Sequence, residues 1–174
     1  MNVRNVLLSM ISALCMTDVA YGIDMEIPAC QEMQYQAEYR SAHHCLSLNL
    51  YHEARSEGRL GMKAVGWVTL NRVHSERYPN TVCDVVYQAR LNDNGNPIRN
   101  QCQFSWWCDG LSDTPYDEVA WIEAQDIAHE VLQNYGVIED PTESAIMYHA
   151  SYVNPYWADS YDLTVRIGMH IFYK

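Results

Sequence analysis

The sequence predicts a mainly helical α+β domain with a small β element late in the chain. Apolar residues recur at helical spacing over residues 42–57, 60–73 and 120–132, whereas residues 164–173 alternate between apolar and polar side chains, as in a half-buried strand. Helices followed by a short β region are typical of α+β folds. The 174 residues, 48% of them hydrophobic, suit one domain with one core. Polar residues 23–41 predict a spacer or a short peripheral helix, so the domain spans residues 42–174.

The first 22 residues have the features of a secretory signal peptide. Arg4 supplies a positive n-region, residues 6–16 form a short apolar run, and residues 20–22 offer small side chains at cleavage spacing. The run is too short to cross a bilayer as a mature helix. We therefore expect an exported protein, with an uncleaved membrane tether as the alternative.

Two helices are expected to follow the spacer. The first spans residues 42–57 and carries Leu50 on its apolar stripe. Glu53 lies three residues after Leu50, and Glu57 lies four residues after Glu53. Both carboxylates therefore continue the apolar stripe instead of opposing it. The second helix, over residues 60–73, is apolar around most of its circumference, which predicts a buried central helix.

The middle of the chain predicts a short helix, a hairpin and an extended strip. Thr81 and Asp84 have the spacing of a capping box that opens a short helix. Asn94-Gly95 is a strong signal for a two-residue hairpin turn. Residues 102–110 are rich in aromatic side chains and are expected to be extended.

The last third of the chain predicts one long helix and two strands. Thr114, followed by Pro and Asp117, has the pattern of a helix start, and Gly136 is the natural stop of the helix. Residues 145–150 are short and apolar enough for a strand. Residues 164–173 are expected to form a second strand, half-buried along its length.

Composition restricts the class of partner. A net charge of −11 argues against binding to nucleic acid, because the phosphate backbone needs a basic surface. The sequence contains thirteen Tyr and five Trp but only two Phe. Rings with an apolar face and a polar tip suit a groove that stacks on sugars, although a tyrosine-rich core and surface explains the same composition.

The cysteines are compatible with disulfides in an exported protein. Cys15 would leave with the signal peptide, and five cysteines remain. Cys102 and Cys108 bracket a short segment and are the favoured pair. An odd remainder predicts a free thiol or an intermolecular bridge, and the lack of a C-x-x-C pair makes a zinc site the weaker interpretation.

Glu53 and Glu57 are the candidate chemical groups. A carboxyl that is partly desolvated at a helix C-terminus is pushed toward its protonated form. An acid that is still protonated near neutral pH can donate a proton to a leaving oxygen, as glycosidic bond cleavage requires. The alternative is a solvated helix face on which the two acids pair with Arg55, Arg59 or Arg72.

Two other kinds of site have less support. His52, His149 and His170 could hold a metal, but they lack the H-E-x-x-H spacing that places two imidazoles on one helix face. Ser105 with His149 could form a nucleophile pair, but no G-x-S-x-G elbow is present. We expect neither a metal nor another cofactor.

Blocks of sequence in a fixed order resemble a known family. They are YHEARSEG, GWVTLNRV, YPNTVCDVVYQ, CQFSWWCDG, MYHASYVNPYWA and VRIGMHIFYK. Together they resemble the cell wall hydrolase family of the spore cortex-lytic enzymes, over about Leu46 to Lys174. The resemblance implies a lysozyme-like or lytic transglycosylase-like fold and cleavage of peptidoglycan between N-acetylmuramic acid and N-acetylglucosamine.

The same resemblance assigns roles to residues. The family's catalytic glutamate falls on Glu53, which as a single acid and base suffices for lytic transglycosylation. A hydrolase would want a second carboxylate, for which Glu57 and Asp109 are candidates, although an orienting role paired with a cation is favoured for Glu57. Trp106 is expected to be a stacking platform for sugar. The residues expected along the substrate groove are Glu57, Gln103, Ser105, Trp106, Tyr148 and His149. The alternative is that the residues of the QFSW and YHA segments are simply strand and core residues, which we expect for about half of them.

The implied partner is the glycan strand of peptidoglycan. We expect a monomer with at most transient membrane association through its N-terminus, located in the periplasm, the cell envelope or outside the cell, or in the host envelope if the protein is a phage endolysin. One alternative function is a non-catalytic peptidoglycan-binding or lysozyme-inhibiting protein. Another is an amidase or peptidase that acts on the stem peptide.

Overall fold

The computed structural model describes the backbone of residues 26–174 and the side chains of residues 31–174. The predicted signal peptide and the side chain of Cys30 lie outside the described residues. The chain divides into two units between Arg40 and Ser41. Helix α2 spans Glu26–Ala54, so of the two alternatives for the polar segment before residue 42 the helix is formed over residues 26–41, continuous with the next expected helix. The first part of α2 belongs to the first unit, and the rest of α2 and all later elements belong to the second. Within the described part of the chain, no helix is long and apolar enough to cross a membrane.

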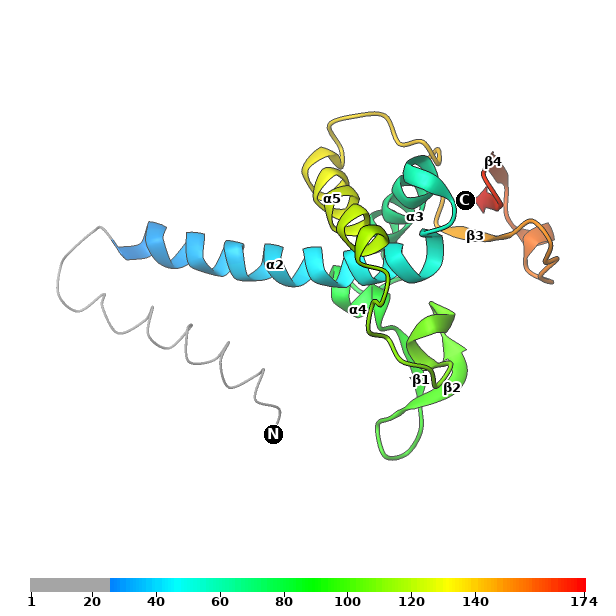
Figure 1. Cartoon of the computed structure of the whole chain (residues 1–174), viewed down its shortest axis with the longest axis horizontal. Helices are drawn as coiled ribbons and strands as arrows, with labels where there is room; N and C mark the ends of the chain where they lie inside the picture. The colour runs from blue at the N-terminus through cyan, green and yellow to red at the C-terminus, as the bar shows by residue number, and fades with distance from the viewer. Residues whose placement is uncertain (1–25) are drawn as a thin grey trace. The chain divides into compact units, whose positions relative to one another are not determined.

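Helix α3 (Gly58–Val73) is the centre of the domain, as its apolar circumference predicts. It lies beside α5 (Glu118–Asn134; Figure 1). A Cβ atom at Gly66 would lie 3.2 Å from Val131 of α5 and 3.5 Å from Leu50 of α2. The absence of a side chain at Gly66 therefore lets α2, α3 and α5 pack closely together at this residue. The side chains that share this core include Leu46, Leu50, Tyr51, Met62, Val65, Trp67, Val85, Val86, Ile127 and Val131.

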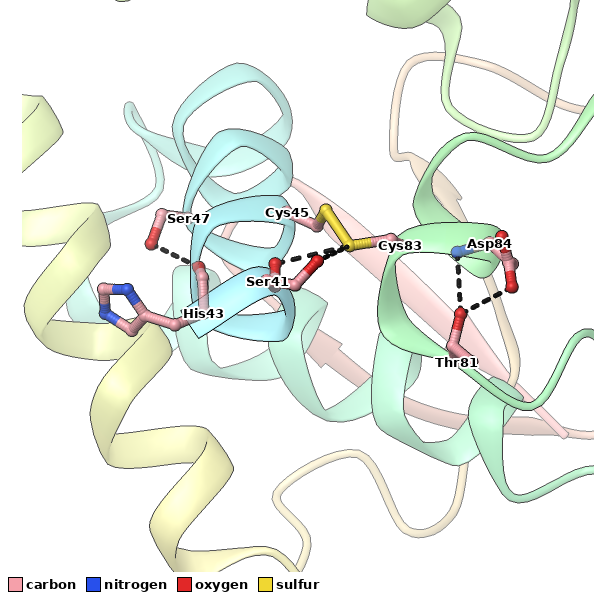
Figure 2. The surroundings of a disulfide bond; sticks show 7 residues. All are labelled: Ser41, His43, Cys45, Ser47, Thr81, Cys83 and Asp84. Carbon is pink, nitrogen blue, oxygen red and sulfur yellow. Dashed lines mark hydrogen bonds between the residues drawn. A yellow bond between two sulfur atoms is a disulfide. The ribbon is translucent and has the colours of Figure 1, made fainter. Parts of the chain in front are cut away.

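Helix α4 (Val82–Val86) begins with the predicted cap, in which the Thr81 side chain accepts a hydrogen bond from the backbone N–H of Asp84. A disulfide joins Cys83 of this helix to Cys45 of α2 (Figure 2). Ser41 lies with its hydroxyl 3.3 Å from the sulfur of Cys83, and because a disulfide sulfur only accepts, the serine donates. The bond fixes the short α4 against the end of α2 that carries the candidate site.

Strands β1 (Ala89–Leu91) and β2 (Pro97–Cys102) form an antiparallel hairpin around the predicted turn. Its loop is longer than the two residues expected. The reason is the side chain of Asn92, which accepts hydrogen bonds at 3.0 Å from the backbone N–H groups of both Asn94 and Asn96. These bonds satisfy the loop backbone locally and keep it out of the strand ladder.

The aromatic strip after β2 is not extended, and that expectation was wrong. Residues Ser105–Cys108 form the 3₁₀ helix η2. The predicted Cys102–Cys108 disulfide is confirmed, and its two Cα atoms lie 6.1 Å apart. Six extended residues would span about 20 Å, so the bridge requires the segment to coil.

Helix α5 starts at Glu118, later than predicted, because Asp117 is the capping residue. The Asp117 carboxylate accepts a hydrogen bond from the backbone N–H of Ala120 at 3.0 Å. The hydroxyl of buried Tyr51 accepts the N–H groups of Tyr116 and Asp117, so these donors are satisfied without a helical turn. The helix ends at Asn134, and Gly136 adopts the positive φ of 74° expected of a stop.

The late β element is a three-stranded antiparallel sheet in the order β3-β5-β4. Strand β3 spans Met147–Ala150, β4 spans Leu163–Ile167 and β5 spans His170–Tyr173, with the short 3₁₀ helix η3 (Ala158–Ser160) before β4. Residues 164–173 are therefore a hairpin and not one half-buried strand. Strand β5 is buried along its whole length because it is the central strand. The α+β class itself is confirmed.

Candidate active site

A cleft of about 440 Å³ lies where the end of α2, the end of α3, the β2–η2 segment and the late sheet meet. Its floor and walls mix polar groups with aromatic rings, the usual composition of a ligand site. The residues that line it are His52, Glu53, Arg72, Cys102, Gln103, Phe104, Ser105, Met147, Tyr148, His149, Ala150, Tyr152, Trp157 and His170.

Glu53 is the carboxylate of this cleft. It lies in the last turn of α2 and is partly buried. Burial raises the pKa of its carboxyl above the ordinary value of 4.5, while a hydrogen bond from Tyr148 and the charge of Arg72 act in the opposite direction. The raised pKa extends the pH range over which Glu53 still holds a proton that it can give away.

Tyr148 of β3 donates its hydroxyl to Oε2 of Glu53 at 2.8 Å. Burial, and next the negative charge of Glu53, raise the pKa of the Tyr148 phenol well above its ordinary value. The phenol therefore stays protonated and always has a hydrogen to donate. This bond fixes which oxygen of Glu53 is turned toward the sheet and leaves the other oxygen for the cleft.

Arg72, in the last turn of α3, supplies the positive charge of the site. Its side chain is 3% exposed, and its Nε donates to the backbone oxygen of Ile146 at 2.7 Å. The guanidinium lies over the rings of Phe104, Tyr78 and Tyr148, with centroid distances of 5.1, 5.4 and 6.0 Å. Within the described part of the chain, no direct ion pair joins it to Glu53, so its charge acts on the carboxyl through space.

Five of the predicted site residues line the cleft: Glu53, Gln103, Ser105, Tyr148 and His149. Trp106 does not, and the stacking role expected for it was wrong. Its side chain is 6% exposed, its Nε1 donates to Oδ1 of Asn49 at 3.0 Å, and its ring stacks on His52 at 4.6 Å. It is a core residue that supports the cleft from behind.

Glu57 also lies outside the cleft lining, which contradicts its expected place in the groove. Its Oε2 accepts a hydrogen bond from the backbone N–H of Met169 at 2.7 Å. Gly168 precedes this residue with φ of 55°, and a Cβ there would collide with the Glu57 carboxylate. Glu57 therefore holds the β4–β5 turn against α3 through a backbone group and not through the expected cation.

The arginines near Glu57 have other partners. Arg55 lies over the rings of Tyr51 and Tyr116, and Arg59 pairs with Glu123 and Glu130 of α5. The alternative of a solvated face of Glu–Arg pairs is therefore not formed around Glu53 and Glu57. The two acids on one stripe have separate surroundings, one in the cleft and one at the turn.

His149 lines the cleft with both ring nitrogens engaged. Nδ1 lies 2.9 Å from the backbone oxygen of Ala150, and Nε2 lies 2.9 Å from the hydroxyl of Tyr173. A carbonyl only accepts, so Nδ1 carries the proton and the tyrosine donates to Nε2. Neither nitrogen is available to activate Ser105. Over residues 31–174, no group of three His, Cys, Asp or Glu side chains is placed to hold a metal ion.

Sequence reasoning missed several residues of the cleft. Arg72 was considered only as a surface partner, although an arginine in the last turn of a mainly apolar helix is a signal of a buried charge. Tyr152 and Trp157 lie in the MYHASYVNPYWA block but were given no role. His170 was considered only as a metal ligand, but it packs its ring on Tyr148 at 5.0 Å, and burial lowers its pKa, which favours the neutral ring.

The pKa of Glu53 predicts how stability depends on pH. Because the folded protein holds this proton more tightly than the unfolded chain, its contribution to stability is full below pH 4.5 and is lost as pH rises through the raised value. Glu53→Gln imitates the protonated acid and keeps an acceptor for Tyr148. We expect this variant to melt higher than the wild type in mildly alkaline buffer and at the same temperature below pH 4.5. Thermal melts of both proteins across this pH range measure the difference in melting temperature. A difference that does not change with pH would contradict the raised pKa of Glu53.

Known proteins resemble this chain in sequence and in fold. The cell wall hydrolase family matches residues 56–173. A spore cortex-lytic enzyme of Oceanobacillus iheyensis is 32% identical over 130 residues, which cover 72% of this chain and 38% of that protein. The chain thus spans well under half of that relative.

Two solved structures are also similar. The catalytic domain of the germination-specific lytic transglycosylase SleB from Bacillus anthracis is 28% identical with a TM-score of 0.58, over 76% of this chain and 93% of that one. The catalytic domain of the Bacillus cereus SleB protein is 28% identical with a TM-score of 0.56, over 78% and 91% of the two chains.

Proposed function

The chain belongs to the cell wall hydrolase family, and from this we propose that it cleaves peptidoglycan glycan strands between N-acetylmuramic acid and N-acetylglucosamine by lytic transglycosylation. The observation that carries the proposal is Glu53, a partly buried carboxyl with a raised pKa. Among the described residues that line the cleft, it is the sole carboxylate. Similarity to the catalytic domain of a lytic transglycosylase supports the same reaction class.

In the first step, protonated Glu53 donates its proton to the glycosidic oxygen. The bond between that oxygen and the anomeric carbon of muramic acid breaks, and the sugar gains oxocarbenium character. Glu53 becomes a carboxylate, which the Tyr148 hydroxyl stabilises by its hydrogen bond and Arg72 by its charge. The rate should fall as pH rises through the pKa of Glu53, because the proton donor is then lost.

In the second step, the C6 hydroxyl of the same muramic acid attacks the anomeric carbon. A new carbon–oxygen bond closes the 1,6-anhydro ring, and the hydroxyl proton passes to the Glu53 carboxylate. The acid is restored and no water is consumed. One carboxyl therefore performs both proton transfers.

A hydrolytic mechanism needs a second carboxylate across the sugar to activate water or to act as nucleophile. Of the two candidates, Glu57 holds the β4–β5 turn. Asp109 caps its own loop by accepting the backbone N–H of Leu111 at 2.7 Å. Their positions outside the cleft lining favour transglycosylation over hydrolysis.

We propose that the reaction takes place outside the cytoplasm, either in the envelope of the producing cell or, for a phage endolysin, in the envelope of its host. The disulfides Cys45–Cys83 and Cys102–Cys108 support this location, because such bonds persist in oxidising compartments. The proposed partner is the glycan strand itself.

Mass spectrometry of the products tests the proposal. Purified peptidoglycan digested by the wild type should release soluble fragments whose muramic ends are one water lighter than reducing ends. Reducing muramic ends would rule out transglycosylation in favour of hydrolysis. New free amines on intact glycan would indicate an amidase or peptidase, and sedimentation with the wall without any release would indicate a binding protein.

A further inference from the structure

We infer that Trp157 and Tyr152 form a binding site for a neutral sugar ring in this cleft, on the far side of strand β3 from Glu53. The inference rests on the proposed function, because it assigns the site to the same glycan strand. It replaces the stacking surface that the buried Trp106 cannot provide.

The first support is the way the cleft passes strand β3. Successive side chains of a strand point to opposite faces of its sheet, yet the neighbours Tyr148 and His149 both line the cleft. This is possible because β3 is an edge strand that pairs with β5 on one side. The cleft therefore wraps over the free edge of β3, with Glu53 and Tyr148 on one face and His149 and Trp157 on the other.

The second support is the rigid placement of Trp157. Its ring meets the rings of His149, Tyr173 and Tyr161 edge to face, with centroid distances of 5.6, 5.6 and 5.9 Å and interplanar angles of 74°, 85° and 89°. These three contacts fix the orientation of the indole while it remains half-buried and lines the cleft. A ring that is already ordered loses little conformational freedom when a sugar packs on it.

The third support is the exposure of Tyr152. This side chain lines the cleft but is 80% exposed. In the described part of the chain, no other ring stacks on it. Its loop is nonetheless ordered by backbone hydrogen bonds from Ser151 to Met169 at 2.7 Å and from Val153 to Ala150 at 2.9 Å. An amphipathic ring held at a cleft in this way is suited to contact a ligand.

The chemistry of this end of the cleft sets the ligand class. Met147, Tyr152 and Trp157 bring apolar surface and polar tips, and both nitrogens of His149 are already engaged. No carboxylate and no lysine or arginine is among the described lining residues beyond β3. A neutral pyranose, with an apolar C–H face and hydroxyl edges, matches this surface better than a charged stem peptide does.

The chain offers a matched control for the test. Tyr156 belongs to the same loop and is 95% exposed, but it does not line the cleft. Soluble glycan strands stripped of stem peptides serve as the probe. Cleavage rates give KM and kcat for the full chain, and a Glu53→Gln background gives the dissociation constant without turnover.

We expect Tyr152→Ala to raise KM and the dissociation constant about two- to tenfold, the range of an aromatic stacking contact, with kcat unchanged. Tyr152→Phe should restore both values, and Tyr156→Ala should match the wild type. Equal constants for Tyr152→Ala and Tyr156→Ala would overturn the sugar site. Absence of glycan cleavage by the wild type would instead refute the proposed function, and the binding measurement would still decide whether Tyr152 contacts the strand.

Discussion

Glu53→Gln is expected to reduce glycan cleavage by about two to four orders of magnitude, the usual contribution of a positioned general acid. Glutamine has the shape of the protonated acid and still accepts the hydrogen bond from Tyr148, but it has no proton to give to the glycosidic oxygen. The measurement is the initial rate of release of soluble fragments from purified peptidoglycan, with circular dichroism of the same sample to verify the fold.

Glu57→Gln is the matched control for this substitution. The amide oxygen of glutamine can still accept the N–H of Met169, so the β4–β5 turn should stay in place. We expect cleavage within about twofold of the wild type, since a surface change away from the chemistry has small effects. If Glu53→Gln cleaved as fast as Glu57→Gln, the assignment of the proton donor would be wrong.

The helices were predictable from the sequence because each carries a signal that acts locally. Apolar spacing identified α3 and the latter part of α2, and the side-chain cap at Thr81 identified the start of α4. Errors arose where a distant group decides the backbone. The start of α5 is delayed by Tyr51, whose hydroxyl satisfies two backbone donors from another part of the chain.

The three-stranded sheet shows what the alternation of apolar and polar residues cannot predict. Apolar and polar residues alternate over 164–173, which predicts one strand with one buried face. The chain instead turns at Gly168, and β5 becomes the central strand of the sheet and is buried on both faces. Burial of a central strand depends on its neighbours, which alternation within one segment does not report.

The candidate site was predictable only in part, for a related reason. The apolar stripe drew attention to Glu53 and Glu57 alike, and only the family resemblance selected Glu53 as the expected acid. The same reasoning could not separate Trp106 from Trp157, because whether an aromatic ring faces a cleft or a core depends on tertiary packing. Arg72 was missed because the rings and the carboxyl around it come from four separate segments.

Arg72→Met is expected to weaken both the fold and the chemistry. The guanidinium is buried against three rings and hydrogen-bonded to Ile146, so its loss removes the cation–π contacts, leaves the Ile146 oxygen without its donor and should lower the free energy of unfolding by about 3 kcal/mol. Urea denaturation measures this loss. Arg77→Met is the control, because Arg77 is exposed and its side chain contacts, among the described residues, only Tyr161, over whose ring it lies and to whose hydroxyl it donates, and its loss should cost less than about 1 kcal/mol.

The effect of Arg72 on catalysis can be separated from its effect on stability by the pH profile. Its positive charge lowers the pKa of Glu53 against the larger effect of burial, so removing it should raise that pKa further. The alkaline limb of the rate, where the proton donor is lost, should then move to higher pH. The maximal rate should fall because the carboxylate formed after proton donation loses its counter-charge. Arg72→Lys keeps the charge without the planar guanidinium, so it should restore the position of the limb even if the fold stays weaker. A limb that does not move in Arg72→Met would mean that Arg72 supports the cleft walls alone and has no electrostatic part in the reaction.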